Sequence, residues 1–209
     1  MKKKILSMLF TLLFLLSVMS TFSAAAAEAS TTDRNDAPAE AVTVFAGGSG
    51  TSNDPWQIAT AEQLDRVRSD LTSHYVWVAD IDLSDYENWM PIGAFQSLSD
   101  APEDAEVPHP DYAFTGTFDG AGHTISNLTV SCEAPMGAGL FGCASGTESG
   151  AAFIGNFTLK DVNVSGFYLV GGAVGLQFMI CSVSDIHLVG NNKLAGMQGI
   201  GGIVGTGLT

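Results

Sequence analysis

Pairs of apolar residues enclosed by glycines recur three times in the second half of the chain. The brackets are Gly139–Gly142, Gly172–Gly175 and Gly202–Gly205, and they begin 33 and then 30 residues apart. Short runs that alternate polar and apolar residues precede them and begin 34 and then 24 residues apart: Ser126–Val130, Lys160–Val164 and Ser184–Leu188. Near-regular periods of this length are typical of solenoids, whose repeats bury an apolar face only by stacking.

The repeating unit is therefore a strand, a loop and a glycine bracket. We predict an all-β fold, because short strands broken by Gly, Asn and Ser follow one another from Thr124 onward. Their spacing favours a parallel β-helix in which the glycines occupy tight corners and the apolar pairs fill a stacked core. An antiparallel sandwich or barrel stays open, since strands at regular intervals also occur there, but the repeated bracket favours the coil.

A single helix is indicated, and it comes before the first repeats. Thr60 and Gln63 form a capping box, and Leu64, Val67 and Leu71 continue with helical spacing. Because the terminal repeat of a stacked core otherwise exposes its apolar face, we expect this short helix to cap one end of the coil.

Alternation also predicts strands between the helix and the repeats. In Tyr75–Leu83 we expect Trp77, Ala79, Ile81 and Leu83 to face the core and Asp80 and Asp82 to share the other face. Phe114–Phe118 is a predicted strand and Asp119–His123 a tight turn. A polar, proline-rich stretch over residues 94–112 is predicted to be a surface loop.

The N-terminus has the three regions of a secretory signal peptide. Three lysines, Lys2 to Lys4, precede an apolar run over Ile5–Phe22, and Ala25–Ala27 provides a cleavage site. We therefore expect residues 1–27 to be a signal peptide, 28–43 a flexible leader and 44–209 the repeat domain. The expected location is secreted, extracellular or associated with the cell wall.

The chain is strongly acidic, with a formal net charge of −14. Loss of the signal peptide removes three lysines and no acidic residue, which takes the net charge to −17. A surface of this sign repels phosphate groups, so we expect neither nucleic acid nor membrane lipid as a partner after signal cleavage.

Three cysteines, Cys132, Cys143 and Cys181, lie in the repeat region without zinc-site spacing. Cys132 and Cys143 are candidates for a disulfide across or between coils. Burial as unpaired thiols is the alternative that the sequence leaves open.

The chain contains an ordered series of motifs: Gly47–Thr51, Asp54–Ile58, Asp80–Ser84, Trp89–Gly93, Phe114–Ile125 and the three glycine brackets. This series resembles bacterial surface proteins with GLUG-motif repeats. The resemblance runs from about residue 45 to 205 and implies a right-handed parallel β-helix of the pectate-lyase-like shape, usually the N-terminal part of a large multidomain exported protein. Similar repeats accompany IgA-specific metallopeptidases and adhesin-like proteins of Gram-positive bacteria, and the family supplies no general set of catalytic residues.

A peptidase zinc centre is not encoded in this sequence. None of the four histidines begins a His-Glu-x-x-His motif: His74, His109, His123 and His187. Calcium is a further hypothesis for Asp80, Asp82 and Asp85, but their spacing differs from that of a calcium-binding loop. We assign no metal, no cofactor and no catalytic residue.

Polysaccharide-cleaving activity is the enzymatic alternative, because parallel β-helices commonly host it. A polyuronate lyase requires cationic groups, and no Lys or Arg lies between Arg68 and Lys160, an interval with 13 acidic residues. An inverting hydrolase needs only carboxylates, which Asp80, Asp82 and Asp119 would supply. The structural alternative is that these aspartates accept hydrogen bonds from loop amides and shape turns.

Exposed aromatic side chains on one flank would be platforms for sugar rings, but aromatic residues inside strand patterns are generally core. We expect core positions for most of Trp56, Tyr75, Trp77, Tyr86, Trp89, Tyr112 and Tyr168.

The leading hypothesis is a non-catalytic secreted or cell-surface module, adhesin-like or stalk-like, that presents loops to a glycan or a host surface protein. The alternatives are a carbohydrate-active enzyme, either hydrolase or lyase, and the N-terminal non-catalytic part of a large surface peptidase. The bracket at Gly202–Gly205 is followed by no capping pattern, so we expect the repeat array, and further domains of the same polypeptide, to continue beyond Thr209.

Overall fold

Strands account for most of the regular secondary structure of the described residues. The computed structural model describes residues 44–94, 112–132, 137–148 and 150–208, which belong to one compact unit. The predicted signal peptide, the leader and nearly all of the predicted loop 94–112 lie outside these residues. The elements are β1 (Trp56–Ile58), α2 (Ala61–Asp65), η1 (Arg66–Ser69), β2 (His74–Trp77), β3 (Ile81–Asp82), β4 (Thr117–Asp119), β5 (Thr124–Ser126), β6 (Thr129–Cys132), β7 (Phe141–Ser145), β8 (Ala152–Lys160), β9 (Asn163–Gly166), β10 (Tyr168–Val170), β11 (Val174–Phe178), β12 (Cys181–Val189), β13 (Lys193–Ala195), β14 (Gln198–Ile200) and β15 (Val204–Leu208).

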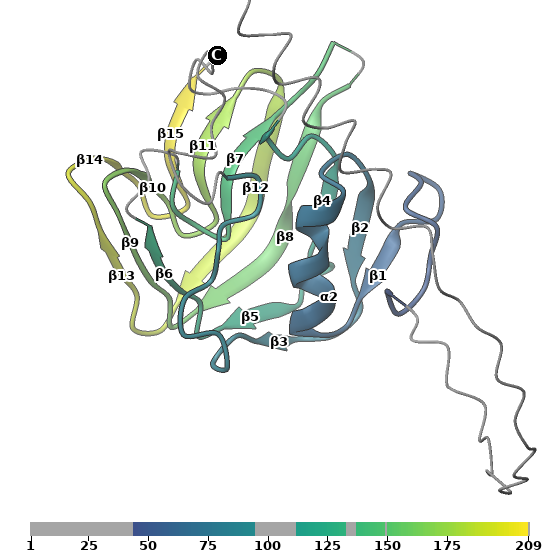
Figure 1. Cartoon of the computed structure of the whole chain (residues 1–209), viewed down its shortest axis with the longest axis horizontal. Coiled ribbons are helices and arrows are strands. Elements are labelled where there is room, and N and C mark those ends of the chain that lie inside the picture. The colour runs from purple at the N-terminus through teal and green to yellow at the C-terminus, as the bar shows by residue number, and fades with distance from the viewer. Residues whose placement is uncertain (1–43, 95–111, 133–136, 149, 209) are drawn as a thin grey trace, which may run out of the picture. The chain divides into compact units, whose positions relative to one another are not determined.

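The strands assemble into four sheets, and every pairing between these named strands is parallel. The largest sheet follows β1-β2-β4-β8 and continues through β5 to β3, with β12 also paired to β8. The others have the orders β13-β9-β6, β15-β11-β7 and β10-β14. Figure 1 shows these sets of strands side by side. The all-β prediction is confirmed, and the antiparallel sandwich or barrel is wrong for the described strands.

From β5 onward, strands that follow one another along the chain enter different sheets, and each sheet is revisited about 30 residues later. Val130 pairs with Val164, and Val164 pairs with Leu194, at intervals of 34 and 30 residues. Phe141, Val174 and Val204 form an equivalent row. We use the word coil for one such passage through the sheets.

The three glycine brackets stack as the repeat predicts, and the apolar pair of each opens one strand of β7, β11 or β15. Leu140, Phe141, Ala173 and Val174 are buried. No bracket glycine has a positive φ, so none is needed for a left-handed turn, and every bracket glycine except Gly202 lies where an added Cβ would meet a neighbouring atom closely. A Cβ on Gly175, for example, would lie 2.4 Å from Cα of Gly137.

Two details of the predicted strands are wrong. Asn127 and Asp161 have φ values of 61° and 55°, so a left-handed corner interrupts Ser126–Val130 and Lys160–Val164. Ser184 pairs with Gly155 and not with Lys160, so Ser184–Leu188 belongs to a different position on the coil. The strand that pairs with Val164 on the third coil is β13, which contains Leu194. With this strand in place of Ser184–Leu188, the irregular 24-residue interval disappears.

Left-handed corners are themselves stacked. Ala121, Asn156 and Asp185 have φ values of 49°, 61° and 54°. Gly122 N donates to Asn156 O, and β8 and β12 pair on either side of Asn156 and Asp185, so the three corners lie in one column. Asn127, Asp161 and Gly190 form a second column.

The predicted strands near the N-terminus are shorter than expected. Tyr75–Leu83 divides into β2 and β3, and Phe114 lies outside β4 and bridges to Ala144. Trp77, Ile81 and Leu83 are nevertheless buried, and Asp80 and Asp82 are exposed as predicted.

Aromatic side chains fill the core at this end of the sheet. Tyr75, Trp77 and Trp89 are at most 1% exposed, which confirms their predicted core positions. Phe118 lies at the centre, with ring centroids 4.9 Å from Phe141 and 5.2 Å from Trp77. Trp56, Tyr86, Tyr112 and Tyr168 are only partly buried.

The predicted helix forms as α2 and η1 and joins the same core, but it ends at Ser69, before the predicted position Leu71. Thr60 is its N-cap and accepts from Gln63 N, while the Gln63 side chain reaches back to Ala59 N at 2.8 Å. Leu64 and Val67 are fully buried in the cluster that contains the sheet residues.

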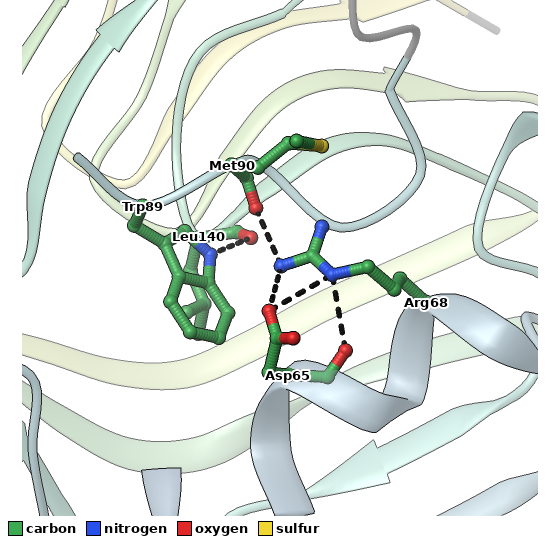
Figure 2. A network of polar contacts seen from close by, with 5 residues as sticks. All are labelled: Asp65, Arg68, Trp89, Met90 and Leu140. Atoms are coloured by element: carbon green, nitrogen blue, oxygen red, sulfur yellow. Dashed lines mark hydrogen bonds and ion pairs between the residues drawn. The ribbon is translucent and has the colours of Figure 1, made fainter. Parts of the chain in front are cut away.

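An arginine ties this helical segment to the coil (Figure 2). The guanidinium of Arg68 binds the Asp65 carboxylate, donates to Met90 O at 3.0 Å and lies 5.2 Å from the centroid of the Trp89 ring. Trp89 Nε1 in turn donates to Leu140 O at 3.2 Å.

Two of the cysteines are buried thiols. Cys143 packs with Ala113 and Leu176, and burial raises its pKa to about 12. Burial also raises the pKa of Cys181 to about 11. The structure therefore places Cys143 as a small apolar core residue, one of the two alternatives that the sequence left open, and not in a disulfide with Cys132. In the described part of the chain, no helix has the length and apolar character needed to cross a membrane.

Candidate functional site

Asp80 lies exposed after β2 and reaches the next coil. Its Oδ1 accepts from Thr124 N at 2.9 Å and lies 3.1 Å from His123 Nδ1. The hydrogen bond from Thr124 N is the main cause that lowers the pKa of Asp80, and the contact with His123 adds to it. The carboxylate thus joins two coils in its ionised form.

Asp82 repeats this arrangement at the second corner column. Its Oδ1 accepts from Asn127 Nδ2 at 2.8 Å and from Ser84 N at 2.9 Å. These two bonds, the first being the larger influence, lower the pKa of Asp82. A general acid requires the opposite shift, because it must keep its proton near neutral pH.

Asp119 closes β4 and the turn that follows. Its Oδ1 accepts from Ala121 N at 2.8 Å and from Asn156 Nδ2 at 3.0 Å. The prediction that Asp80, Asp82 and Asp119 accept hydrogen bonds from neighbouring amides and support turns is therefore confirmed.

One groove brings Asp119 together with residues from two later coils. It has a volume of about 420 Å³ and is lined by Asp119, Ala121, Gly122, Asn156, Phe157, Thr158, Asp185 and His187. Asp80 and Asp82 do not line it. We call this surface the corner groove, because it follows the column of left-handed residues Ala121, Asn156 and Asp185.

The corner groove contains unused polar groups. Asp185 and His187 are exposed, and within the described residues neither side chain makes a hydrogen bond or ion pair. Sequence reasoning did not connect these residues with Asp119, because their proximity depends on the pairing of β12 with β8. The signal that was available is the acidic or amide residue that each of the three coils places at or directly after the row of Asp119, Gly155 and Ser184: Asp119, Asn156 and Asp185.

The charged side chains do not form a metal centre. Across residues 44–94, 112–132, 137–148 and 150–208, no three His, Cys, Asp or Glu side chains converge on one point. Asp80 and Asp82 use an oxygen each to accept neighbouring amide hydrogens, so the calcium hypothesis for Asp80, Asp82 and Asp85 gains no support. What the groove can do chemically is accept hydrogen bonds and repel anions.

Comparison with known proteins gives partial matches. No family model matches the chain. It is 33% identical over 164 residues to Halomucin from Haloquadratum walsbyi, and this match covers 76% of the chain. It is 30% identical over 153 residues to a putative Gly-rich membrane protein from Evansella cellulosilytica, with 69% of the chain covered. The matches span only 2% and 16% of the length of these two relatives.

Among solved structures, the chain is similar to a putative immunoglobulin A1 protease from Bacteroides ovatus. The TM-score is 0.47 and the sequence identity 20%, and the match covers 68% of this chain and 41% of the other.

Proposed function

We propose that this chain is a non-catalytic module of a secreted or cell-surface protein, built as a right-handed parallel β-helix that serves as a stalk-like scaffold and presents its outer surface to a glycan or host partner. The observation that supports this best is the register of the parallel strands. Each coil continues the rows of the previous one, as in Phe141, Val174 and Val204.

Such a register favours rigidity. Inward positions stack into a continuous apolar core, and parallel ladders join each coil to the next along its whole path. A scaffold of this kind holds outward-facing residues at fixed spacing, which suits presentation of a surface better than closure around a substrate.

The relatives are consistent with this proposal. One of them is named as a membrane protein, and both are far longer than the section that matches. This agrees with the resemblance to surface proteins with GLUG-motif repeats, in which such segments form part of a large exported polypeptide.

The last described coil supports the expectation that further repeats adjoin it. Its inward residues Val183, Leu188 and Val204 are only partly buried, and Ile180 and Met197 are 66% and 72% exposed. We propose that another coil with apolar residues at the same inward positions covers this face, because the ladders of β12 to β15 have one partner strand each among the described residues.

A polysaccharide panel tests the absence of catalysis. The folded chain is incubated with neutral and uronate-containing polysaccharides, and new reducing ends and unsaturated uronate absorbance are measured, with Asp119→Asn as the matched variant. We expect no turnover above that of the variant. Turnover that disappears in Asp119→Asn would contradict the proposal.

A carbohydrate-active enzyme is the second candidate, because the corner groove contains two carboxylates, Asp119 and Asp185. Inverting hydrolysis requires a carboxyl pair roughly 6.5–9.5 Å apart, one of them acting as an acid. If this candidate is right, Asp185→Asn abolishes turnover as Asp119→Asn does, whereas substitution of Asp82 leaves it unchanged.

A further inference from the structure

An aromatic side chain, Phe153, lies on the outer face of β8, three residues before Asn156, which lines the corner groove. Ala152 and Ile154 point into the core, so Phe153 points outward, and its side chain is partly exposed. The ring covers Gly155: a Cβ built on that glycine would lie 2.8 Å from Cζ and 3.2 Å from Cε2 of Phe153. The two residues that pair with Phe153 on the neighbouring strands are polar, Thr117 on β4 and Ser182 on β12.

The register places this ring at the edge of the groove. Gly155, under the ring, pairs with Asp119 on one side and with Ser184 on the other. The next residues along β8 and β12 are Asn156 and Asp185, which line the groove. Phe153, Asp119, Asn156 and Asp185 therefore form one continuous surface drawn from three coils.

The groove offers mainly hydrogen-bond acceptors beside that ring. Asp119 Oδ1 is occupied by two donors, which leaves its second oxygen, the side-chain oxygen Oδ1 of Asn156 and both carboxylate oxygens of Asp185. Thr158 and His187 add a hydroxyl and an imidazole. Sugar hydroxyls are donors that carboxylates accept well, and the apolar face of a pyranose packs on an aromatic ring.

We propose that the corner groove and Phe153 together form a binding site for a neutral saccharide, with a sugar ring stacked on Phe153 and hydroxyls bound by Asp119, Asn156 and Asp185. The inference rests on the proposed function, in that it treats the groove as a binding surface and not as an active centre. The volume of about 420 Å³ lies within the range of roughly 300–1,000 Å³ found for small-ligand sites.

Charge determines the class of saccharide. The groove holds two carboxylates and no lysine or arginine among its lining residues, and the whole chain has a net charge of −14. A uronate or sulfated glycan would bring a third anion into this surface and be repelled. Neutral hexose or pentose polymers are compatible with it.

A purely structural role for Phe153 and a cation site at the two carboxylates predict different results. If Phe153 only shields a glycine in the strand, as aromatic residues do in β-sheets, its replacement lowers stability without affecting any ligand. A divalent cation between Asp119 and Asp185 would need no aromatic ring, and its effect would be lost on chelation.

Affinity electrophoresis of the folded chain through gels that contain soluble neutral β-glucan, mannan or galactan tests the site, with polygalacturonate gels for comparison. Phe153→Leu keeps an apolar cover over Gly155 but removes the flat ring. Asp185→Asn is compared with Asp85→Asn, which removes the same charge at an exposed position outside the groove. Circular dichroism confirms that each variant is folded.

We expect at least one neutral polysaccharide to retard the chain, with an apparent Kd about tenfold weaker or more in Phe153→Leu and Asp185→Asn and unchanged in Asp85→Asn. The site is refuted if no neutral polysaccharide retards the chain, if Asp185→Asn and Asp85→Asn behave alike, or if retardation requires calcium and ends with chelator. If only this inference is wrong, the gels show no binding and the polysaccharide panel still shows no turnover. Turnover in the polysaccharide panel contradicts the proposed function itself.

Discussion

Replacement of Arg68 tests how the helical segment of α2 and η1 is attached to the coil. The guanidinium contacts the Asp65 carboxylate and backbone oxygen, Met90 O and the face of Trp89, and no other residue of η1 reproduces these contacts (Figure 2). Arg68→Ala removes all of them, while the neighbouring Arg66 is exposed and provides a matched control at the same charge.

The expected loss follows from the exposure of each contact. The ion pair spans three residues and its side chains are 23% and 43% exposed, so it contributes about 0.3–0.5 kcal/mol. Stacking on Trp89 adds about 0.5–1 kcal/mol, and the exposed hydrogen bond to Met90 O about 1 kcal/mol. We therefore expect Arg68→Ala to lower the free energy of unfolding by about 2 kcal/mol.

Urea denaturation followed by Trp fluorescence measures this change, because Trp89 lies under the guanidinium. Arg66→Ala is expected to change the unfolding free energy by less than about 0.5 kcal/mol, as surface substitutions usually do. Equal losses of unfolding free energy in the two variants would show that positive charge on the helical segment, and not the contacts of Arg68, stabilises the fold. Arg68→Lys should recover only part of the loss, since lysine lacks the planar group that stacks on the indole.

Three further predictions concern the coil itself. Gly175→Ala should lower the unfolding free energy by about 1–3 kcal/mol, because its Cβ would lie 2.4 Å from a backbone Cα, whereas Gly207→Ala meets no atom within 4 Å and should have little effect in the same urea titration; equal effects would show that the brackets are not close-approach sites. The pKa of Asp82 is lowered in the folded state by Asn127 and a backbone amide, so its stabilisation is full above the unfolded pKa near 4 and is lost as pH falls through the folded value. Thermal melts between about pH 6 and about pH 2 should show a shallower acid loss for Asp82→Asn than for the unmodified chain, and parallel curves would contradict this assignment. Cys143, whose pKa burial raises to about 12, should resist alkylation by iodoacetamide at about pH 8 until urea unfolds the chain, and rapid labelling of the native protein, read by mass spectrometry, would argue against its burial.

Local pattern was sufficient to predict the elements that bury apolar residues. The capping box at Thr60 and Gln63 formed as expected, and Leu64 and Val67 became core. The brackets stacked because their period reflects the coil itself. What local pattern missed were the corners: Asn127 and Asp161 interrupt runs that alternate correctly, and asparagine or aspartate in a left-handed conformation leaves no mark on alternation.

The corner groove was beyond sequence reasoning for a related reason. Asp119 and Asp185 are 66 positions apart in the printed sequence, and only the combined pairing of β4, β8 and β12 brings them to one surface. A register shifted by a single residue would turn every outward side chain of a strand inward. Predicting the groove therefore required the pairing of Ser184 with Gly155, which the 24-residue interval had concealed.

Because the register decides which side chains face inward, the residues that hold the fold together differ from those that form the groove surface. Inward residues such as Ile154 and Phe157 are fixed by core packing, while Phe153 and Asn156 share the same strand and face solvent or the groove. Asn156 lies at a left-handed corner. The inward and outward alternation of side chains is interrupted there, while Ile154 before the corner and Phe157 after it both stay buried. Outward residues at the corners can therefore change identity from coil to coil, as Ala121, Asn156 and Asp185 do, while the stacked core stays the same. A binding surface located on such a column can acquire specificity by substitution alone, without insertion of a loop.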